Sequence, residues 1–290
     1  MSIFIEKETR VLVQGITGNE GSYWTRHMIE LGTNVVAGVT PGKGGQTVEG
    51  VTVYNTVRQA VEATGADASV LFVPPRFSHD AIFEALDAGI RKVVVTAEGI
   101  PLHEAMEVRV AALALGATVI GGNTTGVITP GVAMMGFLPY WIDRVYKPGR
   151  VGVMTRSGSL TNEATAMMVE AGYGVSSLIG IGGDAVPFTR FVDMLPAFEA
   201  DPETDAVLII GELGGTMEEE VAEAIETGVF TKPLVAFIAG RNAPEGKKMG
   251  HAGAIISGGK GTVAGKAEAL RAAGALVADK PSQIGELFEQ

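Results

Sequence analysis

The chain has 290 residues, a formal net charge of −11 and no cysteine. The acidic balance argues against a nucleic-acid-binding surface, because phosphate backbones are bound by clustered lysine and arginine. Without cysteine, this chain has no disulfide, no thiolate metal site and no cysteine nucleophile. Forty glycines and a hydrophobic fraction of 46% are typical of an α/β protein with many tight turns around buried parallel strands.

The first residues, MSIFIEKETR, acquire charge too early for a signal peptide. The longest weakly polar run, Val110–Gly122, is too short to span a bilayer. We therefore expect a cytoplasmic protein.

Over residues 1–122, short β-branched runs alternate strictly with helix-like stretches. This alternation predicts a parallel sheet with right-handed crossovers. The predicted strands are 11–13, 34–39, 69–73, 92–95 and 118–120, and the predicted helices lie near 20–31, 57–64, 78–89 and 103–115.

The stretch VLVQGITGNEG places Gly15, Gly18 and Gly21 between the first strand and a helix. Such a loop lets backbone N–H groups approach a phosphate at the helix N-terminus. The spacing is not the dinucleotide G-x-G-x-x-G, and the second strand ends in GVTPGKGG, with Lys43 in place of the acidic residue that holds a ribose. The pair of loops favours a nucleotide-type phosphate site other than NAD; the alternative is that the glycines only make tight turns.

Residues 123–150 interrupt the alternation with prolines and glycines, and we interpret them as a connecting segment. Alternation resumes over 151–290, which predicts a second open α/β domain. Its predicted strands lie near 151–154, 177–180, 206–210, 234–238 and 276–278, and its helices near 161–172, 191–200, 217–227 and 262–273.

Three loops of the second domain should meet at the carboxyl ends of its strands. The first, MTRSGSLTNE at 154–163, leads into a helix whose N–H groups suit an anion. The second, GELGGTMEEE at 211–220, carries Glu212, and its Thr216 with Glu219 predicts a capping box. The third, GKKMGHAGAI at 246–255, surrounds His251 with residues that have almost no side chains.

An exposed neutral imidazole can attack phosphorus, and a carboxylate on its other ring nitrogen fixes the tautomer. Glu212 is the candidate partner of His251. The alternative is a surface or hydrogen-bonded structural histidine. We expect no metal site, because the remaining three histidines lack paired ligand spacing.

Several stretches together resemble the α subunit of succinate-CoA ligase, and the related CoA-binding half of ATP-citrate lyase shares the plan. The likeness runs in order from about Val11 to Glu286. It rests on GITGNEG, GVTPGKGG, AEGIP, GVITPG, RSGSLTNEA, GIGGD, DPETDAVLIIGELGG, TKPLVAFIAGRNAPEGKKMGHAGAII and GGKGT.

This resemblance implies a CoA-binding Rossmann-like domain over 1–122 and a flavodoxin-like ligase domain over 151–290. It implies an acid-CoA ligase that joins a small di- or tricarboxylate to coenzyme A. ATP or GTP with Mg would bind on an ATP-grasp β subunit, in an αβ or α2β2 assembly. His251 would carry the phosphoryl group, and Glu212 would orient the His251 ring. An acyl phosphate would form before the thioester. The resemblance places the phosphate cradle on Ser157, Gly158 and Ser159, and the CoA contacts on Thr17, Gly18, Asn19, Glu20, Lys43, Val73, Pro74 and Glu98.

Some positions depart from the family pattern. Thr124 stands where cysteine is usual, Asn162 where tyrosine is usual and Phe188 where glycine is usual. These residues are candidates for substrate selectivity, and a changed acid such as malate or citrate is one interpretation. The other is neutral drift with repacking, or adaptation to a different β subunit.

Two further classes of function remain open at this point. The chain could be a non-catalytic CoA-binding regulatory module, although the retention of both Glu212 and His251 argues against it. A nicotinamide dehydrogenase is disfavoured by the spacing of the glycine loop and by Lys43.

Overall fold

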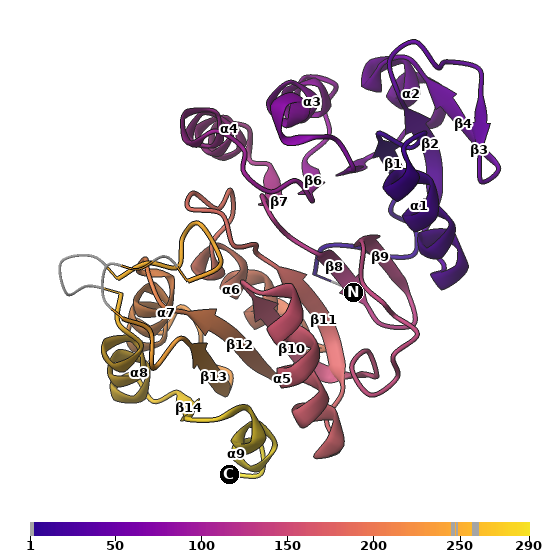
Figure 1. The fold of residues 1–290 in the computed structure, drawn as a ribbon. Coiled ribbons are helices and arrows are strands. Elements are labelled where there is room, and N and C mark those ends of the chain that lie inside the picture. Colours follow the sequence, from indigo (N-terminus) through magenta and orange to yellow (C-terminus); the bar gives the residue numbers. More distant parts are fainter. Residues whose placement is uncertain (1–2, 245–246, 248, 257–260) are drawn as a thin grey trace. The chain divides into compact units, whose positions relative to one another are not determined.

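The computed structural model describes residues 3–244, 247, 249–256 and 261–290 (Figure 1). Parts of the quoted glycine–lysine motifs, at Gly246, Lys248 and 258–260, lie outside the described residues.

The chain divides into two compact units. The N-terminal unit comprises Phe4–Leu138 and Val186–Thr189, and the C-terminal unit comprises Pro139–Ala185 and Arg190–Gln290, with the first residues of the chain. The limits expected for the domains, 1–122, 123–150 and 151–290, stay predictions.

The N-terminal unit is built on a sheet with strand order β3-β4-β2-β1-β5-β6-β7, parallel except for β3. This is the Rossmann order, so the expected α/β class is confirmed. Its elements are β1 (Val11–Gln14), α1 (Asn19–Leu31), β2 (Val35–Val39), β3 (Thr47–Val48), β4 (Val51–Tyr54), α2 (Val57–Thr64), β5 (Ala68–Leu71), α3 (Pro75–Asp87), β6 (Lys92–Val95), α4 (Leu102–Leu115), β7 (Thr118–Gly121), β8 (Gly126–Thr129) and β9 (Ala133–Gly136).

The C-terminal unit carries five parallel strands in the order β14-β13-β12-β10-β11. Numbered within the unit this is 2-1-3-4-5 read from the other edge, the flavodoxin-like order that the resemblance implies. Its elements are β10 (Pro148–Thr155), α5 (Gly158–Glu170), β11 (Val175–Gly180), α6 (Phe191–Ala200), β12 (Ala206–Glu212), α7 (Met217–Glu226), β13 (Leu234–Ala239), α8 (Val263–Ala272), β14 (Leu276–Ala278), η1 (Pro281–Gln283) and α9 (Ile284–Leu287).

Two hairpins were not predicted. In the first, Glu49 and Gly50 both adopt positive φ in a two-residue turn between β3 and β4. In the second, β8 and β9 pair within the segment interpreted as a connection. Gly126 and Gly136 face each other there, and a Cβ on Gly126 would lie 2.1 Å from the Met135 carbonyl oxygen. The glycines that interrupt the alternation therefore permit close strand pairing.

Helix starts follow local chemistry. The hydroxyls of Thr56, Ser157 and Thr262 accept the N–H bonds that cap α2, α5 and α8. The capping box predicted at Thr216 is wrong: its hydroxyl instead donates to Glu220, 3.0 Å away. Glu219 is drawn away from the cap because it pairs with Lys266.

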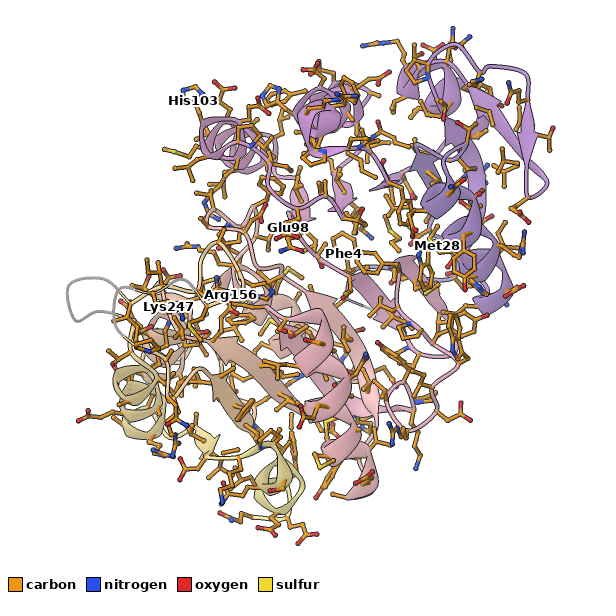
Figure 2. The ribbon with its side chains drawn as sticks, viewed as in Figure 1. Phe4, Met28, Glu98, His103, Arg156 and Lys247 are labelled. Atoms are coloured by element: carbon orange, nitrogen blue, oxygen red, sulfur yellow. The ribbon has the colours of Figure 1, made fainter. Side chains whose placement is uncertain are left out.

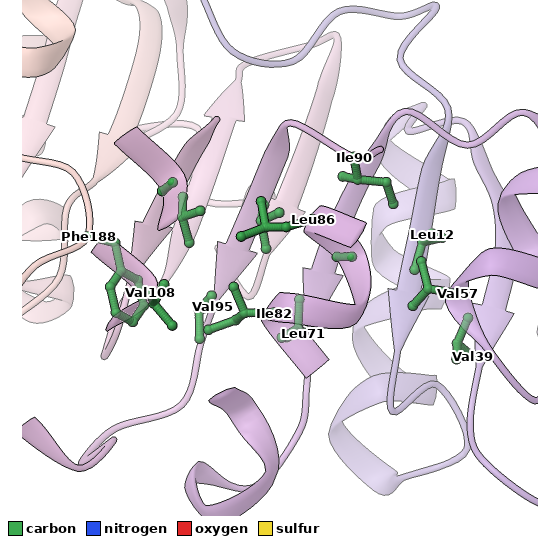
Figure 3. Packing of buried hydrophobic residues seen from close by; sticks show 14 of the residues in the cluster. Leu12, Val39, Val57, Leu71, Ile82, Leu86, Ile90, Val95, Val108 and Phe188 are labelled. Atoms are coloured by element: carbon green, nitrogen blue, oxygen red, sulfur yellow. The ribbon is translucent and has the colours of Figure 1, made fainter. Parts of the chain in front are cut away.

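The core of the N-terminal unit is a cluster of aliphatic side chains between the sheet and its helices (Figure 3). Leu12, Leu71 and Val95 supply it from the strands, and Ile82 and Val108 from the helices. Each fully buried aliphatic side chain contributes about 1.5–3 kcal/mol. Strand ends are thereby held rigidly, which fixes the loops that follow them. No helix in the described part of the chain is both long and apolar enough to cross a bilayer.

Candidate active site

The first ligand-binding edge lies where strand order reverses in the N-terminal unit, between β1 and β5. Ligands in open α/β sheets bind beyond the carboxyl ends of strands at such a point. A cavity of about 440 Å³ lies there, lined by Gln14, Gly15, Thr40, Val73 and Pro74 among others.

The glycine loop at this edge needs its glycines. Gly15 has φ +78°, and a Cβ there would lie 2.3 Å from the Phe72 carbonyl oxygen. A Cβ on Gly21 would lie 2.2 Å from the Gly15 carbonyl oxygen. Helix α1 begins without a side-chain cap, so its first N–H groups suit a phosphate. The residues present therefore fit a phosphate-bearing ligand.

The predicted CoA contacts lie on loops at this same edge. The Thr17 hydroxyl donates to Thr40, 3.2 Å away, and so joins the glycine loop to the end of β2. Glu20 lines a second cavity of about 330 Å³ that shares Val73 and Pro74 with the first. Gly18, Lys43 and Glu98 are exposed on these loops, and Asn19 is exposed at the start of α1.

Sequence reasoning missed most of the residues that line these cavities, among them Gln14, Phe72 and Phe137. Gln14 carries no motif, and its amide donates to Ser69 and Ala81, at 3.1 and 3.0 Å. Its place at the end of a strand beside the switch point was the available signal.

The C-terminal unit has its own switch point, between β10 and β12. Arg156, labelled in Figure 2, follows β10. Glu212 is the last residue of β12, so both lie at the carboxyl ends of adjacent strands. Glu212 Oε1 lies 3.1 Å from Arg156 Nη2, and both side chains are buried. A buried carboxylate needs such a partner, because an unpaired charge inside a protein is costly.

His251 meets the other oxygen of Glu212. The distance from His251 Nδ1 to Glu212 Oε2 is 2.7 Å, and the His251 side chain is 26% exposed. The predicted pairing is thus present in the structure. Because an ionised carboxylate only accepts hydrogen bonds, Nδ1 is the protonated nitrogen, and the lone pair of the neutral ring lies on Nε2.

Arg156 was not recognised in the sequence as part of the site. Beyond Glu212, its Nη1 donates to the Gly214 carbonyl oxygen at 3.4 Å. Gly253 in the histidine loop lies so close that a Cβ there would be 2.5 Å from Nη2. One guanidinium therefore joins the carboxylate, the loop that follows it and the histidine loop.

Gly183, in the GIGGD motif, was also missed. The His251 ring lies against its bare Cα, and a Cβ there would be 2.5 Å from His251 Cγ. The Gly183 carbonyl oxygen accepts the Gly253 N–H at 3.3 Å. The absence of a side chain at Gly183 therefore lets the imidazole ring pack against the backbone.

If His251 carries a phosphoryl group, as the resemblance implies, replacing Gly183 with alanine is expected to slow its phosphorylation about 10- to 100-fold, because the methyl group would displace the ring. The rate of phosphohistidine formation in the reconstituted enzyme measures this. Gly265→Ala is the matched control, since its Cβ would approach only the Thr262 hydroxyl, at 3.2 Å. Equal rates in the two variants would contradict the role of Gly183 in placing the His251 ring.

The start of α5 faces the same cavity as the histidine. Ser157, Ser159, Glu212 and His251 line a cavity of about 300 Å³. Gly158 is the first residue of α5, between the two serines. Hydroxyls, helix N–H groups and the imidazole are thereby brought together, which suits a phosphoryl group.

The three selectivity candidates lie in different surroundings. Phe188 is 3% exposed, and its ring packs in the core cluster close to Val108 (Figure 3). Thr124 is equally buried, and its hydroxyl accepts the Gly126 N–H. Asn162 lies on α5, within one helical turn of Ser159. Phe188 and Thr124 therefore favour the repacking interpretation, while Asn162 lies near the phosphate cradle.

Comparison with known proteins shows the family of the chain. Residues 6–99 match the CoA binding domain family and residues 154–276 match the CoA-ligase family. The chain is 66% identical over 290 residues to the ADP-forming sulfoacetate-CoA ligase subunit SqwL of Acholeplasma sp, covering 100% of this chain and 98% of that subunit. It is 53% identical over 288 residues to the succinate-CoA ligase [ADP-forming] subunit alpha of Aquifex aeolicus, covering 99% of this chain and 93% of that subunit.

Among solved structures, ATP citrate lyase from Methanothrix soehngenii, in complex with citrate and coenzyme A, matches with a TM-score of 0.90 and 29% identity. That match covers 98% of this chain, which spans 50% of the lyase chain. The resemblance seen in the sequence is confirmed, and the chain belongs to the family of ADP-forming acid-CoA ligase α subunits.

Proposed function

We propose that this chain is the phosphohistidine-carrying subunit of an ADP-forming ligase that makes the CoA thioester of sulfoacetate. The observation that carries the chemistry is the 2.7 Å contact between His251 Nδ1 and Glu212 Oε2. It directs the lone pair of the neutral ring to Nε2, the atom that attacks phosphorus.

Three transfers follow. His251 Nε2 attacks the terminal phosphorus of ATP and ADP leaves, while the positive charge that develops on the ring is stabilised by Glu212. A substrate carboxylate oxygen then attacks the phosphohistidine phosphorus and releases the imidazole, giving an acyl phosphate. The CoA thiol then attacks the acyl carbon, the bond between the acyl carbon and the phosphate oxygen breaks, and the departing inorganic phosphate takes up the thiol proton. Ser157, Gly158 and Ser159 would hold the phosphoryl oxygens at the start of α5.

Coenzyme A fits the N-terminal unit. Its phosphates would lie over the N-terminus of α1 and near Lys43, and its slender arm along the cavity at Val73 and Pro74. The nucleotide would bind to an ATP-grasp β subunit in an αβ or α2β2 assembly. The partner assignment is supported by the relatives, which are named as subunits of ligases.

Two observations support sulfoacetate over succinate. Identity to the sulfoacetate-CoA ligase subunit is 66%, against 53% for the succinate-CoA ligase subunit. Asn162, within one helical turn of Ser159, also stands where the family has tyrosine, and an amide can donate a hydrogen bond to a sulfonate oxygen.

The amide of Asn162 is held in one orientation. The Tyr146 hydroxyl donates to Asn162 Oδ1 at 2.8 Å, and burial raises the pKa of Tyr146, so the phenol stays a neutral donor. With Oδ1 occupied in this way, the Nδ2 hydrogens point elsewhere and can donate to an anionic oxygen.

The test is a panel of acids assayed with the complex of this chain and its β partner. Sulfoacetate is expected to give a kcat/KM for thioester formation at least about tenfold above those of succinate, malate and citrate. In parallel, γ-labelled ATP should label this chain with an acid-labile, base-stable phosphate. A preference for succinate would overturn the substrate, and an unlabelled chain would overturn the mechanism.

A further inference from the structure

A fully buried ion pair lies next to the backbone of Glu212, and no step of the proposed reaction uses it. Glu218 on α7 and Lys266 on α8 are both 0% exposed and hydrogen-bonded to each other. Burying two charges costs several kcal/mol of desolvation per ion, and apolar side chains of the same size often give equal or better stability. The pair therefore calls for a role other than stability.

Glu218, the acidic member of the pair, binds the backbone of Glu212. In the ladder between β10 and β12, Thr155 pairs with Ile210 and the Arg156 N–H bonds to the Ile210 carbonyl oxygen. The Glu212 N–H, two residues on, points to the same side, where β10 has already ended. Glu218 Oε1 accepts this N–H at 3.1 Å, in place of the missing strand.

Gly211 allows the Glu218 carboxylate to take the place of a neighbouring strand. A Cβ at that position would lie 2.3 Å from Glu218 Oε1, so only glycine lets the carboxylate reach the strand end. A buried N–H without an acceptor is strongly unfavourable. The acceptor on Glu218 therefore fixes the position of the Glu212 backbone.

Lys266 holds the other end of the same turn. Its Nζ donates to the Gly215 carbonyl oxygen at 3.1 Å and to Glu219 Oε2 at 3.0 Å. Between the two anchors, Gly214 abuts the histidine loop, since a Cβ there would lie 2.3 Å from the Gly253 carbonyl oxygen. The ion pair thus fixes both ends of the turn that joins Glu212 to the histidine loop.

We propose that Glu218 and Lys266 are a positioning pair, which holds the Glu212 backbone so that its carboxylate meets Nδ1 of His251. The catalytic consequence rests on the proposed function, whereas the geometry does not. Neither residue touches the substrate. Their effect passes through the tautomer of His251.

The experiment compares two double variants that differ in one acceptor. Glu218→Gln with Lys266→Met removes both charges but keeps an oxygen for the Glu212 N–H. Glu218→Leu with Lys266→Met removes the same charges and that oxygen. In the full chain with ¹⁵N-labelled histidine rings, the nitrogen shifts show which nitrogen of His251 is protonated, and only four histidines need to be resolved. His251→Asn assigns the signal.

The glutamine variant is expected to keep the proton on Nδ1 and to phosphorylate within about threefold of wild type. In the leucine variant the protonated fraction on Nδ1 falls, and phosphorylation slows at least about tenfold. Glu220→Leu, on the same helix but paired with Arg190, is the control and should change neither reading. The proposal is overturned if the two double variants keep the wild-type tautomer, or if both lose it equally.

The two hypotheses fail separately. An unlabelled wild-type complex would end the phosphohistidine mechanism, while the ring nitrogens would still report on the positioning pair. A labelled complex, with wild-type tautomer and rate in the leucine variant, would end only the positioning role.

Discussion

Replacing His251 with asparagine is expected to abolish phosphoryl transfer to this chain and to reduce thioester formation below about one-thousandth of the wild-type rate. An amide cannot form the covalent intermediate, whereas its NH₂ can still donate to Glu212 and keep the loop in place. The loss should therefore be chemical rather than structural. The measurement is incorporation of label from γ-labelled ATP into the reconstituted complex, followed by an assay of the thioester.

Two controls separate the chemistry from binding and folding. His103→Asn, at a side chain that is 85% exposed in the N-terminal unit, should label as wild type does. The calorimetric affinity of His251→Asn for CoA should be unchanged, because the proposed CoA site is built from other residues. Label retained by His251→Asn would place the phosphoryl group on another residue.

The arrangement of strands could be predicted because parallel strands buried on both faces give continuous β-branched runs. The runs at Val11–Gln14 and Lys92–Val95 are of this kind. The β3–β4 hairpin was missed because β3 has only two residues and β4 is buried on one face only, so neither gives a continuous apolar run. At β8 and β9, glycines indicated a break although they permit close pairing.

Contacts that depend on the chemical type of a side chain could be predicted from the sequence. Contacts that depend on how closely two parts of the chain pack were missed. His251 and Glu212 were paired from their loops alone, since both follow strands of one sheet. Gly183 acts only through the space it leaves, which has no signature in a single sequence. Glu218 and Lys266 lie on helices with many charges, where a sequence pattern indicates a solvated face.

The second large effect is expected at Glu212. Glu212→Gln should slow phosphorylation of His251 about 100- to 10 000-fold, the range of a positioned acid–base group. The structure gives the reason, because the carboxylate serves two partners that both donate. Arg156 can only donate, so it draws the amide oxygen of the glutamine to itself.

The glutamine NH₂ group is then left facing His251 Nδ1. It can only donate, so it selects the tautomer with the proton on Nε2, and the nucleophilic lone pair is lost from the atom that needs it. The single-turnover rate of phosphohistidine formation tests this, with Glu226→Gln, on the exposed end of α7, as the control. Adding Arg156→Met to Glu212→Gln frees the amide to turn its oxygen to His251, and part of the rate should return. A rate that falls further would show that Arg156 acts through the loop at Gly214 rather than through the orientation of residue 212.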